Sequence, residues 1–415
     1  MNDIDLKVKK LHIDENSEYR IRRGLPWIFD KYCHFDTTPD NGDVVAIYGK
    51  RNKCIAIGLY DAYSPIRVRI LGSKCTFNQA YMYDKFRAAI EYLSKQGIAS
   101  NDTTGVRLLS GESQGLPGIV IDAYAGTWVV KVYSAIWLNY IDSFLQMLID
   151  VIGLDDDITR KAYVVPLRRI VLRFGRECRV IYEAAGYREG QLLGSNDDTP
   201  YADFMENGMH LRAQVFRGQK TGFFLDQRQN RQIVRSLSAG KKVLDICCYS
   251  GGFSLAAAKG GAKSVWSLDG DKHALDLVAE HFRINADDKA VASCESILEK
   301  CDMYEWLERA KSHRMAFDLV IADPPSFASS QAQIPTAERA YMRLFAAAAD
   351  CLAPGGQILC CSCSSHIGAE KFREIVQRAL KHRTREAIDY TGLPADHVAS
   401  FAEARYLKAW LLTIK

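Results

Sequence analysis

The sequence predicts an α/β protein with a doubly wound parallel sheet in its carboxyl-terminal half. After about residue 195, short apolar runs alternate with helical patterns, whereas the first seventy or so residues hold short β-like runs between turns. Alternating strands and helices are typical of a parallel sheet covered by helices. We therefore expect a small β-rich domain at residues 1–74, a central α+β domain at 75–195 and a doubly wound domain at 196–415.

The composition fits a chain with more than one core. It has 415 residues, of which 48% are apolar, and its formal net charge is only +4. This net charge neither requires nor excludes an acidic partner. The amino terminus is charged, and no apolar run approaches the roughly 18 residues that would span a bilayer. We therefore expect a cytoplasmic protein that does not enter the membrane.

Local patterns predict the elements of the first two domains. The strands of the first domain are VVAIY at 44–48, CIAIGLY at 54–60 and IRVRIL at 66–71. In the second domain, YMYDKFRAAIEYL at 81–93 has helical spacing, and the strands GLPGIVIDAY and TWVVKVY follow it.

A basic cluster lies toward the end of the central domain. Between Arg160 and Arg188 the chain has eight Lys or Arg against two Glu, and Arg168 and Arg169 are adjacent. In one interpretation the cluster binds nucleic acid, because phosphate neutralisation dominates the sequence-independent part of such binding. In the other it is a solvated sheet face, which is favoured when the cluster is taken alone.

Four apolar runs that end in polar or small residues predict the carboxyl-terminal sheet. They are KVLDICC at 242–248, SVWSLDG at 264–270, FDLVIADPP at 317–325 and GGQILCCSCS at 355–364. The helical patterns HALDLVAEHF and AERAYMRLFAAAADCL lie between them. Ligands of such sheets bind beyond the carboxyl ends of the strands, so the residues there are candidates for function.

The first two strand ends indicate a ligand without a diphosphate. Asp245 precedes the small-residue turn CCYSGGFSLAAA, in which Gly251 lets a ligand approach the backbone. The glycine spacing is not that of dinucleotide sites, and the acidic start suits a cationic or neutral adenosyl ligand better than a pyrophosphate. Asp269 stands where an acid accepts hydrogen bonds from ribose hydroxyls, unless it caps the next helix.

Two further acids stand at later strand ends. Asp302 is a candidate for adenine recognition, although an acid before a helix is often an N-cap. The fourth strand ends in Asp323, Pro324 and Pro325, and the two prolines hold the acid in a rigid turn at the ligand edge. An ordinary loop explains the same residues, but their place in the strand order favours function.

The twelve cysteines indicate thiols rather than disulfides, because eight follow residue 246 and several are adjacent. Cys360 and Cys363 form a C-x-x-C, but no second ligand pair completes a zinc site, so we expect no metal. Strand side chains alternate, which puts Cys361 and Cys363 on one face and Cys360 on the other. Cys360 and Cys361 look like core residues, whereas Cys363 lies at the strand end.

Taken together, these motifs resemble a known family. DICCYSGGFSLAAAKGGAKSVWSLDGD, FDLVIADPPSF and CSCSSH look like motifs of class I S-adenosylmethionine-dependent methyltransferases, in the same order. With KTGFFLDQRQNR, GESQGLPGIVID and RRGLPWIF, nearly the whole chain resembles the bacterial large-subunit (23S) ribosomal RNA cytosine-5 methyltransferases. That resemblance implies an amino-terminal PUA domain, a central α+β domain and a Rossmann-like catalytic domain.

The resemblance further implies S-adenosyl-L-methionine as cofactor and ribosomal RNA of the large subunit as partner. The residues that it assigns to the cofactor are Phe224, Asp226 and Arg228 at the methionine end, Asp245, Tyr249 and Gly251 in the turn, Asp269 at the ribose and Asp302 at the adenine. We expect the RNA at Pro324, Pro325, Arg168 and Arg169. Ser326 stands where several relatives have Lys, and its effect on substrate contact is left open.

Cytosine C5 is a poor nucleophile until a thiolate adds at C6. By the resemblance Cys363 is that nucleophile, and Asp323 is the candidate that holds the N3 and N4 edge of a flipped cytosine. One alternative is an RNA amino-group methyltransferase, acting on guanine or adenine nitrogen through Asp-Pro-Pro without a thiol. Others are a catalytically dead RNA-binding protein and a nicotinamide-dependent oxidoreductase, which the glycine spacing disfavours. The modified nucleotide, the base that removes the C5 proton, the domain orientation and a homodimer are left open.

Overall fold

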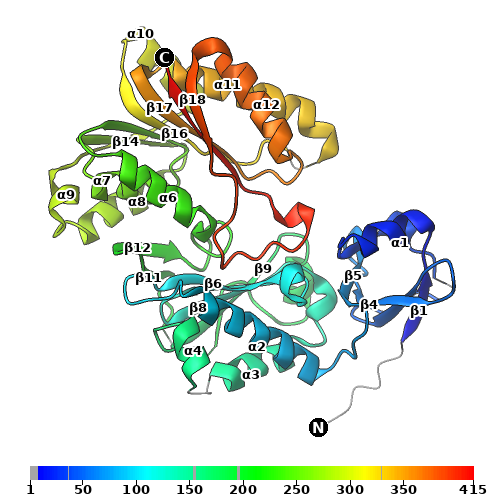
Figure 1. Cartoon of the computed structure of the whole chain (residues 1–415). Helices are drawn as coiled ribbons and strands as arrows, with labels where there is room; N and C mark the ends of the chain where they lie inside the picture. The colour runs from blue at the N-terminus through cyan, green and yellow to red at the C-terminus, as the bar shows by residue number, and fades with distance from the viewer. Residues whose placement is uncertain (1–7, 36, 153–155, 194–196, 329) are drawn as a thin grey trace. The chain divides into compact units, whose positions relative to one another are not determined.

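The computed structural model describes residues 8–35, 37–152, 156–193, 197–328 and 330–415 (Figure 1). The chain forms two compact units. The first unit runs up to Met205 and adds residues 213–225 and 395–404, and the second contains 206–212, 226–394 and 405–415. Each unit is therefore assembled from segments that lie far apart in the sequence.

The first unit begins with a five-stranded sheet in the order β1-β3-β4-β5-β2. β1 pairs with β3 in parallel, and the other pairs are antiparallel. Its elements are β1 (Lys9–His12), α1 (Glu15–Arg22), β2 (Trp27–Phe29), η1 (Asp30–Tyr32), β3 (Val44–Tyr48), β4 (Cys54–Tyr60) and β5 (Ile66–Gly72). β3, β4 and β5 are the three strands that the β-branched runs predict.

A second five-stranded sheet in the first unit has the order β10-β9-β8-β7-β6. β8 and β9 are parallel, and the other neighbours are antiparallel. The strands are β6 (Gly105–Ser110), β7 (Ile119–Tyr124), β8 (Thr127–Val132), β9 (Arg169–Phe174) and β10 (Gln191–Leu193). Around them lie α2 (Gln79–Gln96), η2 (Gly111–Gln114), η3 (Ala135–Trp137), α3 (Ile141–Ile152), α4 (Asp157–Ala162) and α5 (Arg179–Ala184).

The two sheets of the first unit share one core. α2 begins where the Asn78 side chain accepts from the N–H of Tyr81, and it ends at Gly97 in the left-handed region. The helix buries Phe86, and Val44 of the first sheet belongs to the same apolar cluster. This shared burial explains why residues of both sheets form one unit. β11 (Tyr201–Glu206) and β12 (Met209–Gln214) follow as a two-stranded sheet, within which the chain passes to the second unit.

The second unit holds a seven-stranded sheet in the order β15-β14-β13-β16-β17-β19-β18. The strands are β13 (Lys242–Ile246), β14 (Ser264–Asp269), β15 (Glu295–Lys300), β16 (Phe317–Ala322), β17 (Leu352–Ser362), β18 (Thr384–Asp389) and β19 (Lys408–Ile414). The five strands from β15 to β17 are parallel, which confirms the doubly wound prediction. β19 and β18 are antiparallel, and the polar, exposed sequence of β18 has no apolar run that would predict a strand.

Helices cover both faces of this sheet (Figure 1). One face is packed by α10 (Met303–Ser312), α11 (Ile334–Ala349) and α12 (Ala369–Leu380), whose buried residues form a cluster with β13, β16 and β17. The other carries α7 (Gly252–Lys259) and α8 (Lys272–Ile284), with α6 (Arg228–Leu237) beside α7. The remaining elements are η4 (Leu225–Gln227), α9 (Lys289–Ser293), η5 (Gln331–Gln333), η6 (Lys381–Arg383) and η7 (Ala402–Ala404).

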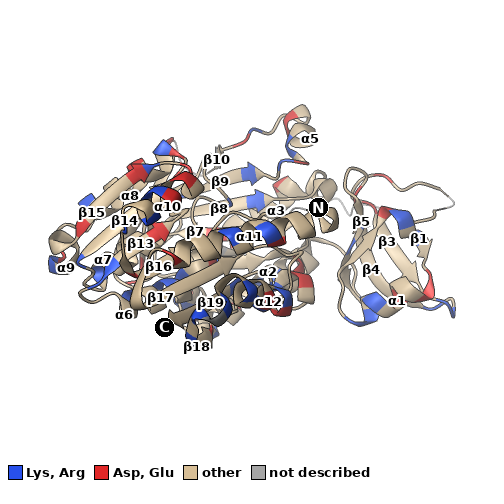
Figure 2. Cartoon of the chain, turned by 90° about the horizontal axis from the view of Figure 1, so that it is seen from above, with Lys and Arg blue, Asp and Glu red and all other residues tan. Residues whose placement is uncertain are grey.

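Charged residues of both signs lie on the helices of the second unit. Figure 2 shows basic and acidic positions interspersed over its helices. In the part of the chain that the structure describes, no helix is long and apolar enough to cross a bilayer.

Candidate active site

A cavity of about 530 Å³ opens at the carboxyl ends of the parallel strands in the second unit. Its walls come from the last residues of β14 and β15 and from residues that follow β13, β14, β15 and β16. They are Cys247, Leu268, Asp269, Gly270, Lys300, Cys301, Asp302, Met303 and Pro325. The sequence places Asp269 and Asp302 at ligand-binding strand ends, and the fold brings both to one cavity. This is the edge where doubly wound sheets bind their ligands.

The turn after β13 has a strained backbone. Cys247 and Tyr249 have positive φ angles of 60° and 48°, and the N–H of Tyr249 donates to Asp269 Oδ2 at 2.8 Å. Gly251 has a φ of 72°, and a Cβ there would come within 2.7 Å of Val278 in α8. A side chain at this position would therefore collide with α8, so the close packing of this helix requires glycine here.

Asp245 lies at the base of this turn and is fully buried. Ser254 Oγ donates to its Oδ2 at 2.6 Å, whereas Oδ1 accepts no hydrogen bond from the described residues. Burial, together with the charges of Asp323 and Asp269, raises the pKa of Asp245 to about 7. A buried carboxyl oxygen without a donor, close to other acids, fits a cationic ligand such as a sulfonium or ammonium group.

Asp269 and Asp302, the two acids in the cavity wall, differ in whether they also cap a helix. Asp269 Oδ1 accepts from the N–H of Asp271, and it is Asp271 that caps α8 by accepting from His273. The alternative that Asp269 caps this helix is therefore wrong. Asp302 does cap α10, because its Oδ1 accepts from the N–H groups of Tyr304 and Glu305. Asp302 is thus both an N-cap and a wall residue of the cavity.

The segment after β12 is held by buried polar contacts. In the second unit, Asp226 accepts from the hydroxyl of Tyr406 at 2.7 Å, and Arg228 lies 3.6 Å from Glu206. Arg231 forms two bonds of 2.6 Å with the same Glu206. Phe224 belongs to the first unit, where the Nζ of Lys220 lies 4.5 Å from its ring centre.

Sequence reasoning missed Gln227 in this segment. Its Nε2 donates to Asp323 Oδ2 at 2.9 Å, and its Oε1 accepts from Asn230. Gln227 therefore orients the acid that follows β16. A signal was present, because the residue stands in KTGFFLDQRQNR between two residues that were singled out.

The thiols of β17 differ in burial. Cys360 and Cys361 are 0% exposed, and burial raises the pKa of both thiols well above its usual value. Cys363 follows the last residue of the strand and is half-buried, as is Asp323 after β16. The charges of Cys363 and Asp323 both add to burial in raising the pKa of Tyr341 to about 12. The two groups therefore face a common neighbour.

The loop after Asp323 packs against the end of β17. Pro324 is buried and Pro325 is exposed. Ser326 Oγ donates to the carbonyl of Ala328 at 2.9 Å, and Ser364 Oγ donates to the same carbonyl at 3.3 Å. The bond from Ser364 thus joins the loop that carries the acid to the loop that carries the thiol.

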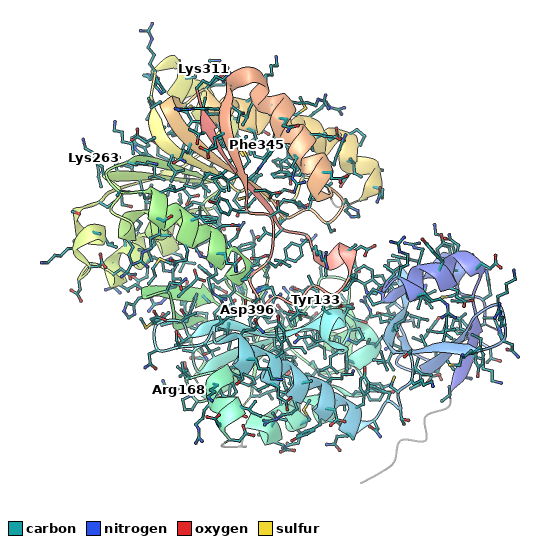
Figure 3. The ribbon with its side chains drawn as sticks, in the orientation of Figure 1. Tyr133, Arg168, Lys263, Lys311, Phe345 and Asp396 are labelled. Carbon is teal, nitrogen blue, oxygen red and sulfur yellow. The ribbon has the colours of Figure 1, made fainter. Side chains whose placement is uncertain are left out.

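The basic cluster of the first unit divides into exposed and buried residues. Arg168 is exposed, and Figure 3 shows it at the periphery of this unit. Arg169 is only 3% exposed, and its guanidinium donates to Thr127 Oγ1 and to the carbonyls of Asp197, Thr199 and Tyr201. The expected phosphate contact of Arg169 is therefore corrected, because its donors are used inside the fold.

All twelve cysteines are thiols. Within the described ranges, no group of three or more His, Cys, Asp or Glu side chains is placed to hold a metal ion.

Comparisons with known proteins agree with this architecture. The family model of S-adenosylmethionine-dependent methyltransferases matches residues 187–391, and that of PUA-like domains matches residues 11–73. The chain is 38% identical to a ribosomal RNA large subunit methyltransferase of Deinococcus radiodurans, over 97% of each chain. It is 30% identical to ribosomal RNA large subunit methyltransferase I of Photobacterium profundum, over 98% of this chain and 99% of that one.

Solved structures show the same fold. A chain assigned as a methyltransferase and crystallised with S-adenosylhomocysteine superposes with a TM-score of 0.80 at 21% identity, covering 98% of this chain and all of that one. A chain from Streptococcus mutans assigned as an S-adenosylmethionine-dependent methyltransferase superposes with a TM-score of 0.79, also at 21% identity and over 98% of this chain and 100% of its own.

Proposed function

The chain belongs to the family of S-adenosylmethionine-dependent ribosomal RNA large subunit methyltransferases with a PUA-like domain, and from this premise we propose that it methylates C5 of a cytosine in large-subunit ribosomal RNA. The observation that carries the proposal is the place of Cys363. Of the three thiols in CCSCS, two are fully buried in the sheet, and Cys363 reaches the partly open strand end. A nucleophile must be accessible, and this thiol meets that condition.

The cofactor residues act through charge and hydrogen-bond acceptance. When bound, S-adenosylmethionine supplies an electrophilic methyl group on a sulfonium. Asp245 offers its buried Oδ1 to the cationic end, and the carboxylate of Asp269 accepts from ribose hydroxyls while it also closes the turn at Tyr249. Asp302 keeps one oxygen for the cap of α10 and presents the other toward the adenine. Phe224, Asp226 and Arg228 are assigned to the methionine end.

Cys363 activates the base covalently. Its thiolate attacks C6 of the cytosine, an S–C6 bond forms, and the electron pair of the C5–C6 double bond moves to C5, which then accepts the methyl group. Loss of the C5 proton and departure of the thiolate restore the aromatic ring. Asp323, oriented by Gln227, holds the N3 and N4 edge of the base and stabilises the protonated N3 of the adduct.

The first unit holds the RNA. The domain at 1–74 and the exposed Arg168 supply contacts to the phosphate backbone, while Pro324 and Pro325 form a rigid edge beside the base. The target atom is out of reach inside a base stack, so the cytosine is flipped out before it reacts.

The test compares two thiols of the same strand. Cys363→Ala should abolish methylation and should keep binding of cofactor and RNA, because it removes only the nucleophile. RNA that contains 5-fluorocytosine should be trapped covalently by the wild type and not by this variant. Methylation is followed as transfer of radiolabelled methyl groups to ribosomal RNA, with the modified base identified by mass spectrometry.

Cys361→Ala is the matched control. It should lower stability by about 1 kcal/mol, as a small core deletion does, and leave the methylation rate near that of the wild type. If Cys363→Ala instead methylates at a near wild-type rate, the thiol mechanism is rejected, and methylation of an exocyclic amino group through Asp323 replaces it.

A further inference from the structure

Lys408 is a buried lysine to which the proposed function gives no role. It begins β19 and pairs in register with Ser362, the last residue of β17. Its backbone therefore lies beside the strand end from which Cys363 emerges. Only 1% of Lys408 is exposed.

The ammonium of Lys408 contacts carbonyl oxygens. Its Nζ donates to the carbonyl of Ser364, the residue after Cys363, and to that of Tyr406 at 2.6 Å. No carboxylate lies within ion-pair distance of this Nζ in the described parts of the chain. A buried cation without an anion is unfavourable, and burial lowers the pKa of Lys408 to about 8. The negative charge that opposes this shift is that of Cys363.

The other titratable groups near Cys363 do not favour a thiolate. Cys361 precedes it on β17 and Tyr341 faces it from α11, and both are buried with raised pKa values. Asp323, after β16, acts on the same two groups and adds a negative charge. From η4, Asp226 accepts from the hydroxyl of Tyr406. A nearby cation stabilises a second anion in this environment, and Lys408, bonded to the carbonyl of the residue after Cys363, is such a cation.

We propose that Lys408 is a positioning residue for the nucleophile: its ammonium stabilises the Cys363 thiolate, and its bond to the Ser364 carbonyl fixes the loop that presents the sulfur. This inference rests on the proposed function, because it takes Cys363 as the nucleophile. Lys408 keeps its proton throughout. The thiol loses its proton to solvent before attack, and the thiolate that leaves C6 returns to the same ammonium.

The test is the pH dependence of Cys363 alkylation in the full-length protein. Iodoacetamide modification is followed by site-resolved mass spectrometry, without RNA or cofactor. In the wild type the midpoint should lie below the ordinary thiol value of about 8.5. Lys408→Met should raise this midpoint by at least about one unit, which slows alkylation at pH 7 about tenfold. Lys408→Arg, which keeps the charge, should keep the midpoint within about half a unit of wild type.

Lys241→Met is the matched control. Lys241 is half-buried and donates to Gln357 in the middle of β17, so the variant removes the same charge away from the thiol. Its alkylation midpoint should equal that of wild type. Thermal unfolding reports whether each variant is folded. If Lys408→Met does not fold, a wild-type midpoint above 8.5 still overturns the proposal, as does an unchanged midpoint in the folded variant.

The two proposals fail separately. If Lys408→Met shifts the midpoint but Cys363→Ala still methylates, the electrostatic pair stands and the thiol mechanism falls. If Cys363→Ala is inactive but Lys408→Met leaves the midpoint unchanged, the nucleophile stands and the role of Lys408 is rejected.

Discussion

Asp245 shows how one carboxyl group can be unfavourable for the fold and useful to the site. It is buried, it has one oxygen bonded to Ser254, and its other oxygen accepts nothing in the described chain. Ionising it in the absence of a cation leaves a buried charge beside Asp269 and Asp323. The ionised carboxylate is therefore unfavourable in the ligand-free fold, and a cation bound at Oδ1, as we propose for the cofactor, would relieve this cost.

Asp245→Asn should stabilise the ligand-free protein at pH 8. The pKa of Asp245 is about 7 in the folded state, above the ordinary value of 3.8. Between these values the folded state holds a proton that the unfolded state has lost, so wild-type stability falls as pH rises through this window. The variant should unfold several degrees higher at pH 8 and near wild type at pH 4. Asp318→Asn, at the start of β16, is the control, and a Tm gain equal at both pH values would contradict this explanation.

Asp269 and Asp271 separate cofactor binding from helix capping. Asp269→Ala should weaken S-adenosylmethionine binding by about 1.5 to 3 kcal/mol, the scale of a lost hydrogen bond to a charged group. Asp271→Ala removes the cap of α8 and should cost about 1 kcal/mol of stability without changing affinity. Calorimetry measures the affinity of both variants for S-adenosylmethionine. If Asp269→Ala binds the cofactor as tightly as the wild type, Asp269 does not contact it.

At the scale of elements, α8 connects distant parts of the second unit through one buried histidine. The N–H of Arg212 donates to His281 Nε2, so the neutral ring carries its proton on Nδ1 and donates to the carbonyl of Ser250. One side chain of this helix thus joins β12 to the turn that follows β13. Val278, one turn earlier, packs against Gly251 in the same turn.

His281 should make the second unit sensitive to acid. Burial lowers its pKa to about 4 from the usual 6.5, because the charged ring is desolvated. The unfolded state therefore binds the proton first as pH falls, and the stability present above pH 6.5 is lost progressively down to about pH 4. Between pH 7 and pH 5 the wild type should lose about 2 kcal/mol of unfolding free energy through this residue, and His281→Gln should not show this loss. Urea unfolding at both pH values measures this free energy. His273 is exposed on the same helix, so His273→Gln should lose as much stability between the two pH values as the wild type.

At the scale of the molecule, the basic cluster in and around β9 contains both buried and exposed arginines. Arg169 and Arg173 are buried and bind carbonyls and Glu189 within the first unit, whereas Arg168 is exposed. Figure 2 marks the basic positions of this strand. Neighbouring residues of one charge run therefore differ, because Arg168 precedes β9, whereas Arg169 and Arg173 belong to a strand in which every residue is buried.

Arg168 and Arg169 should respond differently in RNA binding. Arg168→Glu should weaken binding and flatten the slope of log affinity against log salt by about 0.7 to 0.9, the amount for one phosphate contact. Arg169→Ala should lower the Tm, because it leaves several carbonyls without a donor, and keep the salt slope. Filter binding of ribosomal RNA across salt concentrations reports both. If Arg168→Glu leaves the salt slope unchanged, Arg168 is a solvated surface residue that makes no phosphate contact.

The sequence by itself determined the parallel sheet, the order of its strand ends and the residue types that stand there. These features are local, since an apolar run followed by Asp, Gly or Pro specifies a strand and its end without reference to other parts of the chain. The alternation of CCSCS likewise separates Cys360 from Cys361 and Cys363. The expectation that Cys360 and Cys361 are core residues is confirmed by the full burial of both.

Only the tertiary structure decided which polar side chains meet. Gln227 donates to Asp323 across 96 residues of chain, and Lys408 reaches the carbonyl of Ser364 from an antiparallel strand. Arg169 donates to a carbonyl 30 residues away and is buried. Such contacts depend on how elements pack, and the apolar pattern within one element does not indicate which other elements lie against it. Burial then sets the pKa values, because desolvation depends on all the atoms around a group and not on its position in the chain.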